Sequence, residues 1–492
     1  MSIPAVWRPV TSAVGRAVAV AEEHHWAVPE RLTGLDALFL YAETQSMPMH
    51  VAVTAILDPS TVPGGYSFEK MRDHLARRVP LVPKLMRRVE QVPLRLHHPI
   101  WVDDPDYKVE DHVHRTCLDP PADDRALARF VSEMVSRPLD RSRALWEFWV
   151  IEGLTDGRIA LTGKVHHCAL DGVSAADLMP AFFGLSPDPD PVVAPEARPA
   201  ERPGDLELVG WSVSDRAAHL MGGVAAIGRV GIASVGVRVR RRTNDGAGGT
   251  PLTAPRTPYN GAITASRSIA FGRLPLKKVR KVRQATGVKL NDVILAVTAG
   301  AFREHLAELG QLPEQPLVAA VPMSVRAEDA RGQGETGNQL SVLFVPLHTE
   351  IADPLERLRA TAADAMSAKQ ENALFGSRTL ADLAEVLDPL AVTAALEVYS
   401  RAGLADRHRP PVNAVVSNVP GPPMPIYLGG AKALSLFPMG PVVESVGLNL
   451  TVLSYRNHLD VGLLAASALV PDAWEVLRHL RPAFDELAAA AG

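Results

Sequence analysis

Alternation of apolar and polar residues predicts the strand that organises the first half of the chain. The odd-numbered residues of 159–165 are apolar or glycine and occupy one face, while the even-numbered residues occupy the other. Continued onward, this alternation places His167 with the apolar set and His166 on the opposite face, so only one of them would serve a given site. A turn at 155–157 joins this strand to another predicted over 146–152.

Helical periodicity separates these strands. In the first half we expect helices over 67–78, 125–136 and 175–183, the second of them ended by Pro138. In the second half the first expected helix covers 276–286.

The next helix begins near Asn291, which stands where an N-cap belongs, with Asp292 in the first turn and Gly310 as a stop. Capping is a sufficient reason for Asn291 by itself. A mostly helical region is expected over 353–404, and further strands are expected at 317–322, 337–345, 412–417, 431–437, 447–454 and 458–466. Because neither half shows strict βαβ alternation, the predicted fold class is α+β in two parts of similar size.

Composition shifts divide the chain into four segments. We expect an N-terminal extension at 1–30, a first half at 31–185, a crossover linker at 186–262 and a second half at 263–492. The linker passes from proline-rich to small apolar residues and then to arginines. Two interpretations of 205–242 remain open: an amphipathic helix packed on its own domain, or a segment lying on an anionic membrane or lipid surface.

Overall composition sets limits on partners and compartment. The chain has 492 residues, 47% of them hydrophobic and 22% charged, with a formal net charge of −4, which argues against a dedicated nucleic-acid binder. Cys117 and Cys168 cannot form a disulfide framework, so a reducing cytoplasm is expected. No signal peptide and no run of about 18 uncharged apolar residues is found, so we expect a cytoplasmic or membrane-peripheral protein.

Chemistry concentrates at His166-His167-Cys168-Ala169-Leu170-Asp171-Gly172, where the predicted strand ends. Imidazole has a pKa suited to removing a proton from an alcohol or amine near neutral pH, and a nearby carboxylate can fix its tautomer. The alternative is a buried structural histidine with a capping aspartate. Cys168 also raises the alternative of a thiolate nucleophile, which we disfavour because neighbouring strand-end side chains diverge.

The string HHxxxDG resembles the active-site motif of the chloramphenicol acetyltransferase-like, CoA-dependent acyltransferase superfamily. Further strings resemble the bacterial wax ester synthase/acyl-CoA:diacylglycerol acyltransferase family, and they lie at 138–147, 291–296, 417–422 and 447–455. The resemblance extends over 32–485, and Ala144 replaces the proline of the family's PLW string.

This resemblance implies two chloramphenicol acetyltransferase-like halves with mixed sheets and an active-site tunnel at their interface. It implies transfer of a long-chain acyl group from acyl-CoA to diacylglycerol, to a long-chain alcohol, or to both, without a metal or cofactor. His167 would be the general base, oriented by His166. Asp171 would hold the loop and pair with an arginine, for which Arg326 is the candidate. The remaining supporting residues expected around the substrates are Gly172, Trp146, Asn291 and Asp292.

Other functions remain as alternatives. Within the same fold, the protein would be an acyltransferase for a polyketide or glycolipid alcohol, or a condensation-type enzyme. From another class, it would be a lipid-droplet coat or acyl-binding protein without catalysis. The pairs His24-His25 and His97-His98 lack the spacing of metal sites and are expected at the surface. No GxSxG or P-loop string is present, which argues against a serine esterase or NTPase.

Overall fold

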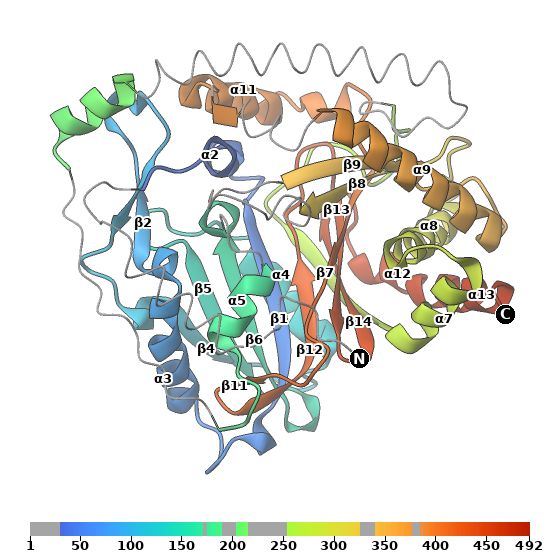
Figure 1. Ribbon diagram of the computed structural model, residues 1–492, viewed down its shortest axis with the longest axis horizontal. Helices are drawn as coiled ribbons and strands as arrows, with labels where there is room; N and C mark the ends of the chain where they lie inside the picture. Colours follow the sequence, from blue (N-terminus) through green and yellow to red (C-terminus); the bar gives the residue numbers. More distant parts are fainter. Residues whose placement is uncertain are drawn as a thin grey trace.

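Two six-stranded mixed sheets form the centre of the molecule (Figure 1). The computed structural model describes residues 30–170, 175–188, 203–214, 253–324, 340–375, 384–385 and 387–492. The first sheet has the order β11 (Tyr427–Leu428), β12 (Ala431–Met439), β1 (His50–Asp58), β6 (Ile159–His166), β5 (Trp146–Glu152) and β4 (Val113–Cys117). The second has the order β7 (Arg267–Pro275), β14 (His458–Ala466), β13 (Leu448–Tyr455), β10 (Ala414–Val419), β8 (Val318–Ser324) and β9 (Leu340–Pro346). The predicted α+β class is confirmed.

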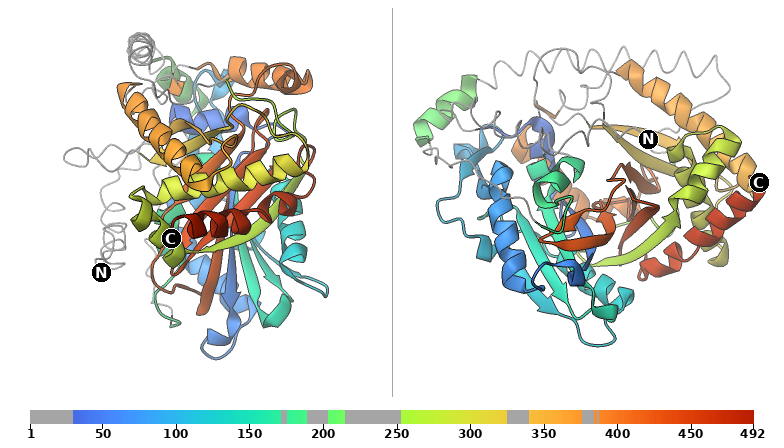
Figure 2. Two further views of the ribbon diagram at one scale, coloured as in Figure 1. Left: turned by 90° about the vertical axis from the view of Figure 1, so that its right-hand side faces the viewer. Right: turned by 60° about the horizontal axis from the view of Figure 1, so that its bottom comes forward.

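Helices flank both sheets. Those of the first half are α2 (Gly34–Ala42), α3 (Phe68–Arg78), α4 (Asp124–Val135) and α5 (Ala175–Phe182). Those of the second half are α7 (Leu276–Thr286), α8 (Leu290–Glu308), α9 (Pro354–Phe375), α11 (Pro389–Arg401), α12 (Ala473–Leu477) and α13 (Leu480–Ala490). In the left view of Figure 2, α8 and α13 cross in front of the second sheet and cover its outer face.

Short 3-10 turns and a two-stranded ribbon complete the described part of the chain. The ribbon pairs β2 (Arg87–Glu90) with β3 (Ile100–Asp103). The turns are η2 (Pro59–Thr61), η3 (Val79–Leu81), η4 (Pro83–Met86), η5 (Pro93–Arg95), η6 (Val109–Asp111), η7 (Thr155–Gly157), η8 (His167–Leu170) and η9 (Leu404–Asp406).

Local sequence accounts for the ends of several elements. The hydroxyl of Ser67 caps α3 by accepting from the Lys70 N–H, which satisfies one of the free amides of the first turn. Helix α7 ends where Gly287 adopts a left-handed φ of 73°, a conformation that costs glycine little. Asp156 and Gly157 likewise take positive φ in the turn between β5 and β6. The helices expected near 67–78 and 276–286 and the turn expected at 155–157 are confirmed.

The second half contributes a hairpin to the first sheet. Strands β11 and β12 lie late in the chain, beginning at Tyr427. Strand β12 nevertheless pairs antiparallel with β1 of the first half, with Leu436 opposite Ala55. In Figure 1 the orange β12 runs beside the blue β1. Strand β12 also packs against β13 and β14 of the second sheet, so it joins the two sheets.

Helix α4 forms a second junction. Its buried residues Leu127 and Val131 belong to the same hydrophobic cluster as Ile269 and Phe271 of β7. That cluster also contains Ala160 of β6, so α4 lies against one face of the first sheet while contacting the second.

The sequence did not predict strand β3, in which the ribbon buries Trp101 and Val102. Two stated expectations are also wrong in detail. His97 and His98, expected at the surface, are buried, and Nδ1 of His98 lies 2.8 Å from the Tyr41 hydroxyl. Asn291 does not cap α8.

The N-cap of α8 is Lys289, two residues before Asn291. Its backbone N–H donates to the carboxylate of Asp292 at 2.9 Å.

No single described helix has the length and hydropathy needed to cross a bilayer. Helices α7 and α8 meet the same criterion only when taken together, across a bend of 105°.

Candidate active site

His166 is the last residue of β6, a strand flanked on both sides by β1 and β5. His167 begins the turn η8, and its backbone N–H donates to the Met49 carbonyl at 2.8 Å. The predicted alternation therefore stops at His166, and it does not determine the direction of His167. Both faces of β6 are buried. On the even-numbered face, buried Lys164 donates to the Met134 carbonyl near the end of α4.

Both ring nitrogens of His166 face protein groups. Nδ1 accepts from the Cys168 backbone N–H at 3.2 Å and lies 2.9 Å from the Cys168 sulfur. Since a backbone N–H can only donate, the neutral ring carries its proton on Nε2. That nitrogen lies 3.6 Å from Oε1 of Glu43, too far for a good hydrogen bond but close enough for attraction. His166 is fully buried, and burial lowers its pKa despite Glu43.

Glu43 links the histidine pair to the segment that carries the PLW-like string. Its Oε2 accepts from Nε and Nη2 of Arg141 at 2.8 and 2.6 Å, and its Oε1 accepts from the Met49 N–H at 3.1 Å. Burial alone would raise the pKa of Glu43, but His166, Arg141 and the Met49 amide lower it to about 2. Glu43 is therefore an anion fixed by three donors, and it orients His166.

His167 is the partly exposed member of the pair. Its ring stacks on Phe39 of α2, with centroids 3.8 Å apart and planes 19° from parallel. Burial, and then the neighbouring His166, lower the pKa of His167 to about 4, so the ring is unprotonated at neutral pH. Its Nδ1 is buried and has no hydrogen-bond partner among the described residues. This histidine can accept a proton from a bound group.

Cys168 is poorly suited to act as a nucleophile. Its side chain is buried against His166, and burial raises the pKa of the thiol well above its usual value. A thiol held in this way is protonated at neutral pH, and only the thiolate is strongly nucleophilic. The reason expected from the sequence, divergence of neighbouring side chains, is wrong, because the sulfur lies 2.9 Å from Nδ1 of His166. The raised pKa of the buried thiol is what disfavours a covalent cysteine mechanism.

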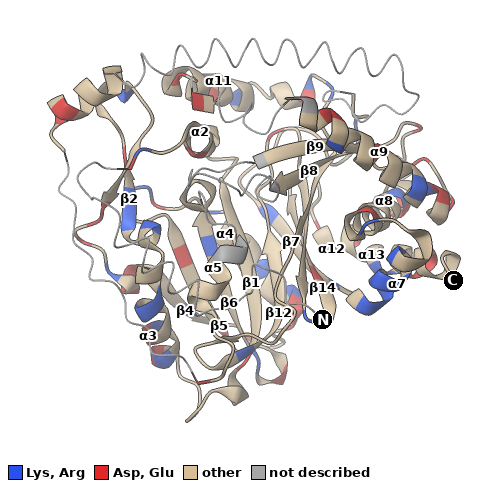
Figure 3. Ribbon diagram, viewed as in Figure 1, with Lys and Arg blue, Asp and Glu red and all other residues tan. Residues whose placement is uncertain are grey.

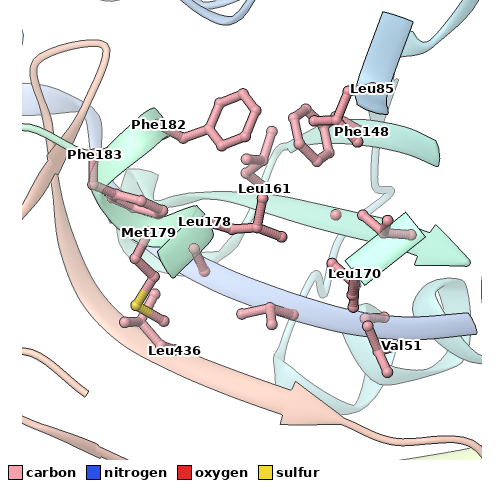
Figure 4. A pocket seen from close by; sticks show the side chains of 15 residues that line it. Val51, Leu85, Phe148, Leu161, Leu170, Leu178, Met179, Phe182, Phe183 and Leu436 are labelled. Atoms are coloured by element: carbon pink, nitrogen blue, oxygen red, sulfur yellow. The ribbon is translucent and has the colours of Figure 1, made fainter. Parts of the chain in front are cut away.

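An apolar pocket begins beside η8 and extends along the odd-numbered face of β6 (Figure 4). Its cavity volume is about 100 Å³, it is partly open to solvent, and every described residue that lines it is apolar or glycine. The residues that line it from β6 are Leu161, Gly163 and Val165, and Leu170 lines it from η8. This lining suits an aliphatic chain.

A polar pocket of about 580 Å³ lies beside Glu43, the residue that faces His166. Arg141 and Leu139 line it from the first half, and Glu397, Ser400 and Arg401 line it from α11. Arg401 pairs with Glu397 at 3.2 Å but keeps 80% of its side chain exposed. The pocket therefore offers guanidinium groups next to the site.

The other predicted site residues differ in their placement. Asp171, Gly172 and Arg326 lie outside the described residues, as does most of the segment 205–242. Trp146 is fully buried, donates from its indole N–H to the Leu85 carbonyl at 2.6 Å and stacks on His112, so it packs in the core.

Asn291 and Asp292 stand in the first turn of α8. Asn291 is partly buried, and Asp292 is engaged in capping. Within the described part of the chain, no hydrogen bond or ion pair joins either of them to the histidines.

Family models match most of the chain. The wax ester synthase/diacylglycerol acyltransferase catalytic domain matches residues 32–294, and the WS/DGAT C-terminal domain matches residues 336–488. The chain belongs to this family. The predicted family and the predicted enzyme class, an acyl-CoA-dependent O-acyltransferase, are thereby confirmed.

Individual relatives agree with the family assignment. Two Mycobacterium tuberculosis proteins provisionally named diacylglycerol O-acyltransferases, Rv1760 and Rv3087, are each 37% identical to this chain. Each alignment covers 94% of this chain, with 91% of the first relative and 97% of the second. Among solved structures, the wax ester synthase/diacylglycerol acyltransferase from Marinobacter aquaeolei VT8 matches with a TM-score of 0.66 at 28% identity, over 94% of this chain and 100% of that one.

More distant structures share the fold alone. The first condensation domain of the CDA synthetase matches with a TM-score of 0.54 at 16% identity, over 94% of this chain and 97% of that one. The predicted likeness to this two-part acyltransferase fold is thus confirmed.

Sequence reasoning did not find Glu43 or Phe39. The family resemblance gives neither of them a role, and both lie more than a hundred residues before the histidines that they contact. The available signal was indirect: Glu43 is a charged residue directly after the apolar helix 34–42, a position that ordinarily faces solvent.

Proposed function

We propose that this protein transfers a long-chain acyl group from acyl-CoA to the hydroxyl group of diacylglycerol, of a long-chain alcohol, or of both, with His167 as general base. One observation carries the proposal: the turn η8 presents an unprotonated, partly exposed histidine and also contributes Leu170 to an apolar pocket. A proton acceptor beside a site for an aliphatic chain is what acyl transfer to an alcohol requires.

The reaction needs one proton acceptor and no covalent intermediate. His167 takes the proton of the acceptor hydroxyl as its oxygen attacks the thioester carbonyl carbon. The carbon–sulfur bond then breaks, and the departing thiolate takes up the proton from His167 to give free CoA and an ester. General base catalysis of this kind contributes about 10²–10⁴-fold, and orientation of the two substrates contributes more.

His166 acts as a positioning residue in this proposal. Its two nitrogens face Cys168 and Glu43, so it fixes the end of β6 rather than exchanging protons with substrate. Asp171, Gly172 and Arg326 keep in this proposal the supporting roles that the family resemblance implies, and all three lie outside the described residues. Asn291 would support the substrates from the second half of the chain. The protein uses no metal or cofactor apart from acyl-CoA.

The CoA portion would lie in the polar pocket beside Glu43. Arg141 and Arg401 line that pocket, and guanidinium groups bind phosphate oxygens well. The thioester would then stand at the histidines, between the polar pocket and the apolar one. A protein that binds acyl-CoA without catalysing acyl transfer would show the same binding, so the decisive measurement is turnover of acyl-CoA.

The test is release of free CoA from palmitoyl-CoA by purified wild-type and His167→Ala protein, with dipalmitoylglycerol or hexadecanol as acceptor and separation of the lipid products. We expect acceptor-dependent release that falls by at least about a hundredfold in His167→Ala. His458→Ala, a partly exposed histidine in β14, serves as the control and should retain activity. Binding of palmitoyl-CoA without release by the wild type would instead identify a non-catalytic acyl-binding protein.

We also propose that the protein works in the cytoplasm at the surface of a membrane or lipid droplet, because its acceptors are insoluble in water. Helix α7 supports this location. It buries Leu276, Val279 and Val282 and contains no acidic residue. Its opposite side carries five exposed cations, blue in Figure 3: Lys277, Lys278, Arg280, Lys281 and Arg283. Such a face is attracted to anionic lipid head groups.

A further inference from the structure

The apolar pocket has two distinct ends. In Figure 4, Leu170 and Val51 lie at one end, near the finish of β6. Met179, Phe183 and Leu436 lie at the other end. Since Leu170 shares the turn η8 with His167, the first end is the reactive end and the second end is remote from it.

We propose that this pocket holds the acyl chain of the donor, and that Met179 of α5 and Leu436 of β12 set the longest chain that it accepts. This inference rests on the proposed function, since it names which substrate occupies a pocket of the same site. It adds the identity of the chain and the residues that limit its length.

The lining favours a single unbranched chain. Among the described residues no polar side chain lines the pocket, so a group with carbonyl oxygens would lose its hydrogen bonds with water and gain none from them. Diacylglycerol carries two ester groups beside its hydroxyl and two chains. A fatty acyl group carries its only oxygen at the thioester carbonyl, which remains at the reactive end. The lining therefore favours the donor chain over diacylglycerol, and the acceptor profile described below separates the donor chain from that of a long-chain alcohol.

The sides of the pocket are rigid. The Phe148 ring packs edge-to-face with Phe182, with centroids 5.2 Å apart and planes 86° apart. Gly163 lies directly beneath this ring, and a β-carbon at that position would stand 2.8 Å from an atom of the Phe148 ring. An acyl chain in the pocket cannot move toward Phe148 without displacing the Phe148–Phe182 pair. A longer acyl chain must therefore extend toward Met179.

Two buried residues stand at the remote end. Met179 has 6% of its surface exposed and Leu436 has none. Leu436 is held in the register of β12 against β1, opposite Ala55, which also lines the pocket. Methionine is the more adaptable of the two, because it is unbranched and takes several rotamers. Its substitution should change the depth of the pocket with little disturbance of the sheet.

The test compares kcat/KM for saturated acyl-CoAs from octanoyl- to arachidoyl-CoA, with hexadecanol as fixed acceptor, in wild type, Met179→Phe and Met179→Ala. We expect Met179→Phe to lower kcat/KM for the longest chains by about fourfold for each methylene that is no longer buried, and Met179→Ala to shift the optimum to longer chains. Met71→Ala is the matched control, because Met71 is equally buried in the same hydrophobic cluster but does not line the pocket.

The outcomes separate this inference from the proposed function. An unchanged donor profile in both Met179 variants, or a shift in the acceptor profile measured with alcohols of different length, would overturn the assignment while leaving the acyltransferase intact. A shift of the same size in Met71→Ala would also overturn it, since general loosening of the core would then explain the result. Failure of wild type with every acyl-CoA would instead refute the proposed function.

Discussion

Glu43 and His166 form a buried pair in which the carboxylate faces the protonated nitrogen of the ring at 3.6 Å. Arg141 and the Met49 amide donate to the same carboxylate, so the Glu43–His166 pair fixes the end of β6, where η8 begins. We expect Glu43→Gln to lower kcat by about ten- to a hundredfold with little change in KM, since a charged interaction of this kind contributes about 1.5–3 kcal/mol.

A matched control for this substitution is Glu397→Gln, which removes an exposed carboxylate from the same polar pocket. It should leave kcat unchanged. Glu43→Asp should recover part of the activity, because a charge remains available to His166. Equal losses in all three variants would show that Glu43 does not position the histidine.

The pH dependence of catalysis should reflect the lowered pKa of His167. Burial and His166 lower this pKa to about 4, so the base remains unprotonated well below its ordinary value of 6.5. We expect kcat/KM to remain level as the pH falls from neutral to about 5, where an unperturbed histidine would already have lost most of its activity. Kinetics with a pH-stable acyl-CoA check this, and an acid limb centred near 6.5 would contradict it.

Stability should fall in acid because several histidines are buried in the neutral form. Burial lowers the pKa of His50 to about 3 and that of His74 to about 4. Between pH 6.5 and these values the unfolded chain binds protons that the folded chain does not, so the free energy of unfolding decreases as the pH falls. Each such histidine contributes a loss of about 2 kcal/mol by pH 5.

Thermal melts at several pH values test this expectation with His74→Gln. The glutamine amide can still donate to the Phe182 carbonyl, which lies 2.8 Å from Nε2 of His74, but it does not titrate. Its Tm should therefore depend less steeply on pH than that of the wild type. An unchanged slope would show that His74 does not contribute.

Arg401 should contribute to recognition of CoA rather than to chemistry. We expect Arg401→Gln to raise KM for palmitoyl-CoA several-fold, by about the contribution of one charge-assisted hydrogen bond, with kcat unchanged. A palmitoyl thioester of N-acetylcysteamine lacks the phosphates and should show no difference between variant and wild type. Equal effects on both donors would argue against phosphate binding in the polar pocket.

Helix α7 should bind anionic lipid surfaces. We expect cosedimentation with phosphatidylglycerol-containing vesicles to weaken by about fivefold for each cation removed in Lys277→Gln, Lys278→Gln and Lys281→Gln combined. The control removes three exposed cations from elsewhere: Arg77, Lys108 and Arg129. Neither set should alter turnover of a soluble short-chain alcohol. Equal binding by both variants would exclude α7 as the contact surface.

Elements with strong local patterns were predictable from the sequence. Strand β14 (His458–Ala466) and helix α7 (Leu276–Thr286) have the expected bounds, because alternation and helical periodicity report directly on which side chains are buried. The short β3 was not predicted, since four residues do not establish a period. The N-cap of α8 is Lys289 and not the expected Asn291, because the carboxylate of Asp292 accepts from the backbone N–H of Lys289.

Contacts between distant segments of the chain were harder to predict from the sequence. The family motif identified His166 and His167, but their partners Glu43 and Phe39 are set by how α2 packs on η8, which no local pattern encodes. The placement of β12 beside β1 likewise depends on pairing across most of the chain. The alternation of β6 failed to orient His167 because the strand ends one residue earlier.

The hairpin β11–β12 also determines when the enzyme becomes complete during its synthesis. Until the ribosome has made residues 427–439, β1 has an unpaired edge in the first sheet, and the pocket lacks Leu436. A nascent chain that stops before this point exposes both a strand edge and apolar side chains, the features that promote aggregation. His166 and His167 are therefore translated early, but the apolar pocket beside them is complete only when nearly nine-tenths of the chain has been made.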